Sequence, residues 1–421
     1  MAASTGFLRD RHQWSMVGTA TVVGLWGLFL VWLSEPFNPW YFLAYAGPVF
    51  VAQAVFTYQR DRIDATLFAP AVLLSGMGLI MVARLAPQLL GRQLCAYLLG
   101  LVGFGCLSLF GAKMPLKKMG RPLGLLGAGL LFVTALFGVQ AGGSRAWLHF
   151  SSFTFQPTEL FKLLLILYLV AHVSKEGTPV VLRDRRGFFS YRDLWGPPFG
   201  LWLCSLLALG LQRDLGGVLL ISGIFWGMLY LVDGRWTTLL AGGALGFVGL
   251  LLATYLFPHG RTRLADWLSL WRGEGIYHQL LQGFYAAAAG GFTGTGLGLG
   301  QPHFIPRVHT DFVLMALWEE LGLLGVVGLL GTYVLMLTYL YKRALRAQRG
   351  QERLLCAGVA LMLGLQILCI VGGNLGLLPL TGITLPFVSY GGSSLVVLWC
   401  ALGLVAAHPG GNRRWQEQSR V

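Results

Sequence analysis

Carboxylates beside an apolar segment are the residues of this chain best placed to do chemistry. Asp311 follows the stretch IPRVHT and opens an apolar run, and Glu319 and Glu320 follow about 12 to 14 Å deeper if the run is an α-helix. Ionised groups in an apolar segment are costly, so three of them mark a candidate functional site. Ordinary capping by Asp311 is the structural alternative. His309 would support proton transfer or, more weakly, metal binding.

A second group of charges lies in the sequence QPTELFK. Glu159 and Lys162 are three residues apart, so on a helix they share a face and can form an ion pair. Lys162 would lie about one turn inside an apolar segment, where a cation is a candidate for a functional role. The alternative is a capped helix start after Pro157 with a local ion pair. Arg213 and Asp214 form another pair in a very short connection, and such a pair also serves as an interfacial anchor.

Two glycine-rich stretches interrupt the apolar pattern. The spacing of GGFTGTGLGLG at 290–300 occurs in dinucleotide-binding loops, but no strand or βαβ unit surrounds it, which argues against that function. Flexible backbone that admits a lipid-linked phosphate and a plain hinge both fit this stretch. The stretch 374–394 has two prolines and several hydroxyls, and irregular backbone of this kind is tolerated at membrane depth only where it lines a cavity or packs on protein.

These groups must be positioned by membrane-spanning helices. Mean hydropathy is +0.66 and only 11% of residues are charged. Apolar runs long enough to cross roughly 30 Å of hydrocarbon recur along the whole chain. The sequence therefore predicts an all-α polytopic membrane protein with about twelve transmembrane helices. The predicted spans are 15–34, 40–57, 65–83, 94–111, 122–141, 158–173, 195–211, 216–232, 236–257, 311–341, 354–373 and 386–407.

The basic residues predict the orientation of these spans. Most of the 31 lysines and arginines fall in the connections on one face, which makes both termini cytoplasmic by the positive-inside rule. The net charge of +14 is then mainly a topology signal, and the scatter of basic residues argues against nucleic-acid binding. All six cysteines lie in apolar spans, which gives no support to a disulfide framework. The longest extracytoplasmic connection, 258–310 between spans nine and ten, is amphipathic and is expected at the outer leaflet.

Four motifs occur in an order typical of one protein family. They are GSRAWL with QPTEL, then QRDLGG, then HTDF followed by WEELG, and finally GLLPLTGITLPFVSYGGSS. With these motifs the chain resembles the SEDS family (shape, elongation, division and sporulation), the RodA/FtsW group of bacterial cell-wall polymerases. The resemblance covers residues 65–408 and implies a ten-helix core. Residues 1–64 would form an N-terminal appendage of two further helices, and residues 409–421 a short cytoplasmic tail.

The resemblance implies a peptidoglycan glycosyltransferase that uses lipid II at the outer leaflet of the bacterial cytoplasmic membrane. In that family the Asp of HTDF is tied to catalysis, which assigns Asp311 as a general base. Arg and Lys side chains would stabilise the pyrophosphate leaving group. The candidates for substrate binding are Arg145, Trp147, Glu159, Lys162, Arg213, Asp214, Arg307, His309, Thr310 and Ser389. No metal ligand is assigned, and dependence on a divalent cation, Mg²⁺ or Mn²⁺, is left open.

The resemblance also implies a partner, a class B penicillin-binding protein that crosslinks the new glycan, and it does not separate elongation from division or sporulation. Three positions depart from the family pattern: Arg307 replaces a frequent Glu, Arg213 a frequent Pro and Gly217 a frequent Thr. The two added positive charges would tighten pyrophosphate binding or mark a different substrate. A flippase for lipid-linked oligosaccharides, with polar groups reaching the cytoplasmic face, and a non-catalytic cell-wall scaffold are the alternative functions.

Overall fold

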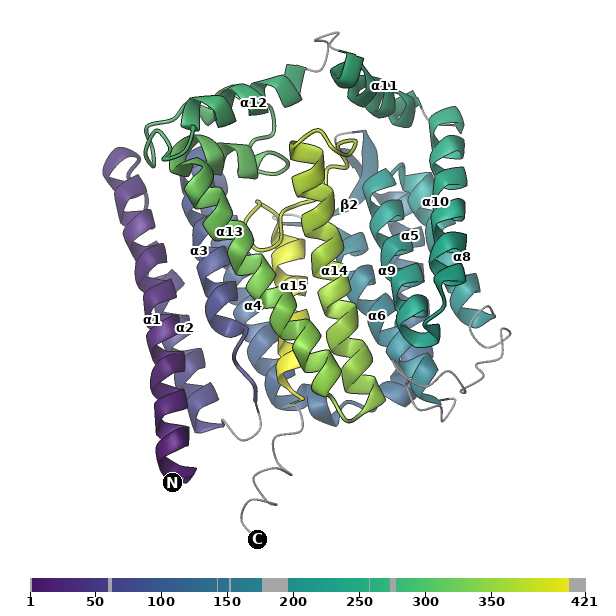
Figure 1. Cartoon of the computed structure of the whole chain (residues 1–421), viewed down its shortest axis with the longest axis horizontal. Helices are drawn as coiled ribbons and strands as arrows, with labels where there is room; N and C mark the ends of the chain where they lie inside the picture. The colour runs from purple at the N-terminus through teal and green to yellow at the C-terminus, as the bar shows by residue number, and fades with distance from the viewer. Residues whose placement is uncertain are drawn as a thin grey trace. The chain divides into compact units, whose positions relative to one another are not determined.

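The computed structural model of the chain describes residues 2–59, 63–141, 143–150, 153–175, 196–256, 258–272 and 278–408. Each predicted span coincides with a helix of the structure (Figure 1). The ends differ by at most six residues, except that the first helix begins at Ala2 rather than at residue 15. These helices are α1 (Ala2–Ser34), α2 (Trp40–Tyr58), α3 (Phe68–Leu85), α4 (Leu90–Phe110), α5 (Leu116–Phe137), α6 (Pro157–Lys175), α8 (Pro197–Gln212), α9 (Leu215–Asp233), α10 (Trp236–Leu256), α13 (Val313–Arg346), α14 (Gly350–Asn374) and α15 (Gly392–Ala406).

Length and composition fit a membrane protein. Among the described residues, eight helices are long and apolar enough to cross a membrane. Three shorter apolar helices lie at Pro197–Gln212, Trp236–Gly249 and Gly392–Ala406. The amphipathic connection between α10 and α13 contains two further helices, α11 (Pro258–Arg272) and α12 (His278–Gly290). The count of twelve spans stays a prediction, because length and apolarity alone do not identify twelve.

The segment before α6 contains a small antiparallel sheet, whose first strand lies at the end of the predicted span 122–141. Its strands are β1 (Val139–Ala141), β2 (Ser144–Phe150) and β3 (Phe153–Phe155), in the order β1-β2-β3. Val139 lies opposite Trp147, and Leu148 lies opposite Phe155. β1 and β3 have three residues each, and the seven residues of β2 do not alternate in burial, so hydrophobic periodicity did not reveal the strands.

Helix α13 is not the continuous helix that was expected, because Gly322 breaks it with φ 71° and ψ −178°. The glycine-rich loop makes the hydrogen bonds that the break removes. Glu319 O and Glu320 O accept from Thr295 N and Gly296 N at 2.9 Å each. Across the break, Leu323 N and Leu324 N donate to Gly291 O and Phe292 O at 3.0 and 3.2 Å. The backbone of 290–300 thus completes the broken helix, a role that the sequence did not predict for it.

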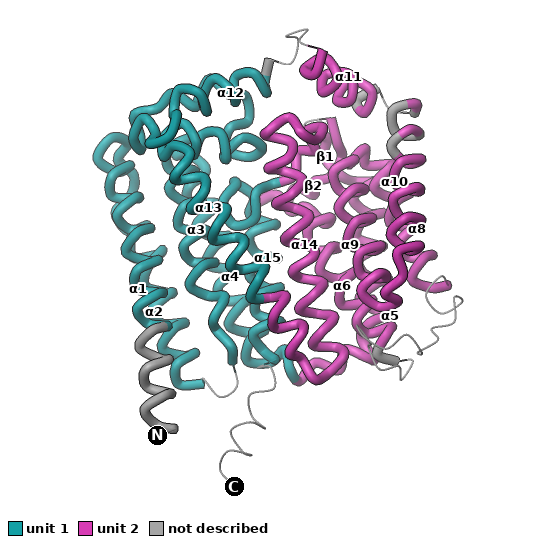
Figure 2. Tube along the Cα trace, in the orientation of Figure 1, with its two compact units in different colours: residues 1–112, 277–339, 384–409 teal, residues 113–276, 340–383, 410–421 magenta. Residues whose placement is uncertain are grey.

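The chain forms two compact units (Figure 2). Unit 1 comprises residues 1–112, 277–339 and 384–409, with α15 packed on α4 and α1 on α3. Its core surrounds Trp399, whose ring lies 5.6 Å from the rings of Phe68 and Phe104 and 5.7 Å from that of Phe387. Gly78 of α3 allows the irregular segment before α15 to approach, because a Cβ there would lie 2.6 Å from Phe387 O.

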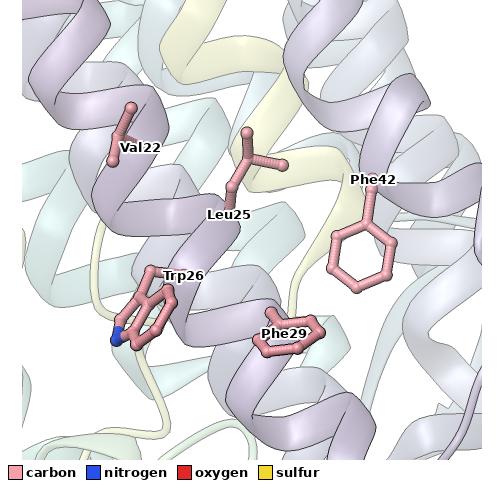
Figure 3. A pocket seen from close by; sticks show the side chains of 5 residues that line it. All are labelled: Val22, Leu25, Trp26, Phe29 and Phe42. Carbon is pink, nitrogen blue, oxygen red and sulfur yellow. The ribbon is translucent and has the colours of Figure 1, made fainter.

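The predicted N-terminal appendage packs within unit 1. Tyr45 of α2 is fully buried between α1 and α3, where a Cβ on Gly24 would lie 2.2 Å from its hydroxyl oxygen and a Cβ on Gly76 2.5 Å. Small residues at this crossing let the helices approach closely, as is common in membrane proteins. An apolar pocket of about 440 Å³ lies on α1 and α2 (Figure 3). Its lining consists of Val22, Leu25, Trp26, Phe29 and Phe42.

Unit 2 comprises residues 113–276, 340–383 and 410–421. Helix α14 packs against α9 and α6, and α5 packs against α6 and α8. Helix α11 holds the segment after α14: Trp267 Nε1 donates to Gly376 O at 2.8 Å and Arg263 Nη1 donates to Thr381 O at 3.1 Å. The amphipathic face of α11 is therefore used partly for protein contacts, in addition to the predicted interfacial role.

Candidate active site

Asp311 lies on a short turn rather than inside a helix. Helix α13 begins at Val313, and the N–H groups of Thr310 and Asp311 both donate to Arg307 O at 3.1 Å. Arg307 has a left-handed conformation, with φ 54°, which tightens the turn. The Asp311 side chain is half-buried, whereas that of Arg307 is exposed. This arrangement places a half-buried acid directly before a helix whose first residues, 313–317, are buried.

The C-terminal motif fixes the backbone directly before Asp311. The Ser389 hydroxyl donates to Thr310 O at 2.6 Å and accepts from Leu385 N at 2.9 Å. Tyr390 N donates to His309 O at 2.9 Å. Ser389, predicted as a substrate-binding residue, thus uses its hydroxyl to hold protein backbone, and its side chain is buried. The irregular stretch before α15 therefore packs on protein, one of the two arrangements expected for it.

Gln93 of α4 also holds this backbone, although no sequence motif points to it. Its side chain is 1% exposed; Nε2 donates to Ser389 O at 3.4 Å and Oε1 accepts from Gly391 N at 3.2 Å. A buried amide that satisfies both a donor and an acceptor fixes a backbone segment strongly. Nothing in the local sequence marks Gln93, because its partners lie almost 300 residues away.

His309 lies beside the acid with its ring against Tyr390, at 5.9 Å between ring centres. Partial burial lowers the pKa of the His309 imidazole below its ordinary 6.5, and the nearby charge of Asp311 opposes this shift. The imidazole is therefore neutral at physiological pH. Thr310, also a candidate, is half-buried, and its hydroxyl donates to Arg307 O at 3.2 Å.

In unit 2, the predicted pairing of Glu159 and Lys162 is confirmed. Lys162 Nζ lies 2.8 Å from Glu159 Oε2, with side-chain exposures of 2% and 10%. The charges are three residues apart on α6, immediately after β3. Burying an ion pair costs free energy unless other contacts compensate for the lost hydration. Stability alone therefore does not explain this pair near the start of α6, which favours a functional role.

Asp214 lies next to this pair. It caps α9: Gly217 N donates to its Oδ1 at 2.8 Å, and the Thr158 hydroxyl lies 3.4 Å from its Oδ2. Burial raises the pKa of the Asp214 carboxyl above its ordinary 3.8, the hydrogen bond from Gly217 opposes this, and the charge of Glu159 adds to it. Thr158, Glu159, Lys162 and Asp214 therefore form one cluster, which we call the α6–α9 cluster.

Two of the departures from the family pattern have a local structural reason. Arg213 ends α8 in a left-handed conformation with φ 59°, which a proline cannot adopt. A Cβ on Gly217 would lie 2.6 Å from Asp214 Oδ2, so glycine lets the carboxylate approach the helix N-terminus. The third departure, Arg307, also has positive φ, but nothing in the structure explains the choice of arginine there.

The remaining candidates lie on β2 and in the broken helix. Arg145 is exposed, and Trp147 is half-buried. Glu319 and Glu320 are buried and hold the glycine-rich loop: Glu319 Oε1 accepts from Gln301 N at 2.7 Å and Glu320 Oε2 from Gly298 N at 3.1 Å. Both carboxylates therefore hold the glycine-rich loop, a structural role that the sequence did not predict for them.

The candidate residues fall into two groups. Unit 1 brings together Arg307, His309, Thr310, Asp311 and Ser389, and unit 2 brings together the α6–α9 cluster. Within the described ranges, no group of three or more His, Cys, Asp or Glu residues is arranged to hold a metal ion.

These observations define a class: a polytopic helical membrane protein with a solvent-accessible acid before a broken helix. A family model of FtsW, RodA and SpoVE cell cycle proteins matches residues 64–409. The chain is 32% identical over 379 residues to the peptidoglycan glycosyltransferase RodA of Mycobacterium tuberculosis, covering 83% of this chain and 79% of that protein. It is 33% identical over 362 residues to the probable peptidoglycan glycosyltransferase FtsW of Nitrosococcus halophilus, covering 81% of this chain and 91% of that protein.

A solved structure supports the same grouping. The fold is similar to a chain of a peptidoglycan synthase complex that coordinates polymerization and crosslinking, with a TM-score of 0.68, 33% identity, and coverage of 82% of this chain and 97% of that one. The chain belongs to the FtsW/RodA/SpoVE family, which confirms the SEDS resemblance and the all-α polytopic fold. The region that the family model matches begins at residue 64, so α1 and α2 lie outside that region.

Proposed function

We propose that this chain is a peptidoglycan glycosyltransferase that polymerises lipid II into β-1,4-linked glycan, with Asp311 as the general base. Relatives that it matches over most of its length are named as peptidoglycan glycosyltransferases. Within the chain, the proposal rests on the burial and position of Asp311. This half-buried acid follows two residues whose carbonyl groups are fixed by Ser389 and Tyr390. A fixed base is what a directed proton transfer requires.

The reaction joins two lipid-linked sugars. Asp311 takes the proton from the 4-hydroxyl of the acceptor sugar as that oxygen attacks the anomeric carbon of the donor. The bond from the anomeric carbon to the pyrophosphate oxygen breaks, and its electron pair leaves with undecaprenyl pyrophosphate. The proton then passes from Asp311 to water, which restores the base for the next addition.

Negative charge that develops on the leaving pyrophosphate needs cations. Arg307, in the same unit as Asp311, has an exposed side chain that can bind phosphate oxygens bidentately. The candidates for substrate contacts in unit 2 are the buried ammonium group of Lys162 and the exposed side chains of Arg145 and Arg213. The α6–α9 cluster keeps Lys162 in place through Glu159, so the ammonium group does not need to reorganise during the reaction.

The chain is a multi-pass membrane protein, and we place the Asp311 turn on the extracytoplasmic side with both termini in the cytoplasm. The distribution of lysine and arginine supports this orientation. The proposed partner is a class B penicillin-binding protein that crosslinks the glycan. The support for it is the likeness to a chain of a synthase complex that coordinates polymerization with crosslinking.

The test is polymer formation from lipid II by the purified full-length chain in liposomes, with and without Mg²⁺ and the partner. Asp311→Asn keeps the shape of the side chain and should lower polymer yield about 10²-fold or more. The matched control is Asp266→Asn, which changes a half-buried acid of α11 and should keep wild-type yield. Equal yield from Asp311→Asn would overturn the assignment of the base. A wild-type chain that moves lipid II across the bilayer without forming polymer would favour the flippase.

A further inference from the structure

Arg84, near the end of α3, joins three separate parts of unit 1. Its Nε lies 3.2 Å from Glu320 Oε1, and its Nη1 lies 3.1 Å from Glu35 Oε1. Its Nη2 donates to Gly298 O at 3.2 Å and to Gly300 O at 3.1 Å. One guanidinium group thus binds α13, the end of α1 and the glycine-rich loop, which is the fixed fork geometry that arginine provides and lysine does not.

The ion pairs of Arg84 with Glu320 and with Glu35 differ in how much they contribute to the stability of the fold. The Glu320 side chain is fully buried and stands next to the buried Glu319, so Arg84 balances charge that would otherwise be costly. Glu35 has a 39% exposed side chain, so its pairing contributes little to stability. Glu35 supplies a second carboxylate for Arg84. This carboxylate orients the guanidinium group and so the two hydrogen bonds that Arg84 donates to the loop.

Glu35 belongs to the part of the chain that the family match leaves out. It directly follows α1, whose close packing against α3 at Gly24 and Gly76 fixes where the carboxylate lies. The family model begins at residue 64. Through Glu35, the α1–α2 region therefore makes a charged contact with the region that the family model matches, and this contact reaches the loop through Arg84.

The loop leads directly to the acid. Gln301 is held by Glu319 at 2.7 Å, and Pro306 O accepts from Gln279 Nε2 at 2.7 Å. From Pro306 the chain enters the turn that carries Asp311. Ten residues separate Gly300 from Asp311, and these two hydrogen bonds tie that connection to α13 and α12, so the loop and the turn share one backbone support.

We propose that the N-terminal helix pair α1–α2 is a positioning element for catalysis, acting through the Glu35–Arg84 ion pair on the glycine-rich loop and so on Asp311. The proposal rests on the proposed function for its catalytic part. Its structural part, that Glu35 orders residues 290–301, is independent of activity. The sequence region outside the family match is thus assigned a role in the reaction rather than only an anchoring role.

The experiment compares Glu35→Ala with Asn38→Ala in the full-length chain. Both substitutions lie in the connection after α1, but Asn38 caps Trp40 N at 3.1 Å, a contact local to that connection. Hydrogen exchange of the amides in 290–301 should quicken several-fold in Glu35→Ala and stay at the wild-type rate in Asn38→Ala. With lipid II, Glu35→Ala should lower kcat about fivefold with KM within about twofold, because misplacement of a catalytic group acts on turnover. Glu35→Asp should restore part of both effects.

Unchanged exchange in 290–301 in Glu35→Ala, or an equal effect in Asn38→Ala, would overturn the proposal. Faster exchange with wild-type kcat would overturn its catalytic part. If the wild-type chain forms no polymer under any condition, the proposed function fails instead, and the exchange comparison still decides whether Glu35 orders the loop.

Discussion

The Ser389 hydroxyl donates a hydrogen bond of 2.6 Å to the backbone carbonyl of Thr310, the residue before the proposed base. Ser389 and Thr310 are 79 residues apart, and both are parts of motifs that the sequence singled out for separate reasons. The bond explains why these motifs occur together: the C-terminal motif supplies the support for the turn that carries Asp311. It also leads to a prediction that separates support from substrate binding.

Ser389→Ala removes both bonds of the hydroxyl and leaves Thr310 O and Leu385 N without this partner. We expect a loss of about 1–3 kcal/mol in stability and a fall in kcat with little change in KM, since the base is displaced while the substrate contacts remain. The control is Ser394→Ala, which removes only the contact with the Thr384 hydroxyl at 3.3 Å. Thermal unfolding and polymerisation kinetics measure both. A rise in KM alone would show that Ser389 contacts substrate.

Lys162→Met should be strongly destabilising, by about 3–5 kcal/mol, because it leaves the Glu159 carboxylate buried without its partner. The double variant Lys162→Met with Glu159→Leu removes both charges and should recover most of this stability. If Lys162 stabilises the leaving pyrophosphate, the double variant is folded yet inactive. Recovery of polymer formation together with stability would show that the pair is only structural.

Asp214→Asn should be as stable as the wild type at acidic pH and more stable at neutral pH. The amide oxygen still accepts from Gly217 N, while the charge next to Glu159 is gone. Because the folded-state pKa of Asp214 is raised above 3.8, its stabilising contribution is present below pH 3.8 and is lost as pH rises through the folded-state value. Asp214→Ala loses the cap and should cost about 1 kcal/mol. Unfolding midpoints of the three proteins across pH check this.

The positions of the long helices were predictable because membrane spans leave a strong signal in apolarity and length. The Glu159–Lys162 pair was predictable for a similar reason: spacing along one helix decides it. The break at Gly322 was not, since a glycine in an apolar run has many structural uses. What decides the break is a loop almost thirty residues earlier, whose N–H and C=O groups replace the missing helical bonds.

Contacts between residues far apart in the sequence could not be predicted either. Gln93 resembles any polar residue near the start of an apolar helix, and only its contacts with Ser389 and Gly391 give it a role. Glu319 and Glu320 were expected to take part in chemistry because buried charges are often functional. In the structure, Arg84 pairs with Glu320, and loop amides donate to both carboxylates. Cost of burial alone did not distinguish a catalytic carboxylate from a structural one.

Gly322→Ala tests the match between the loop and the broken helix. A Cβ at this position would lie 2.3 Å from Gly294 N and 2.4 Å from Phe292 O, and the positive φ is strained for alanine. We expect a loss of about 1–3 kcal/mol from backbone strain, together with faster hydrogen exchange in 290–301. The control is Gly328→Ala in the same helix, where no atom lies within 4 Å of the added Cβ. This change should be neutral or stabilising, because alanine favours a helix. Similar stability of both variants would contradict the role of Gly322.

The His309 imidazole should make the fold sensitive to acid. Burial lowers its folded-state pKa below 6.5, so as pH falls below 6.5 the unfolded chain takes up a proton before the folded one does. Stability is therefore lost between 6.5 and the lower folded-state value. His309→Gln removes this proton uptake, and its unfolding midpoint should decline less than that of the wild type over this interval. His303→Gln, at an exposed ring in the same connection, is the control and should follow the wild type. If His309→Gln and the wild type decline in parallel, the imidazole is not the group that titrates, and the acid sensitivity belongs to a carboxylate.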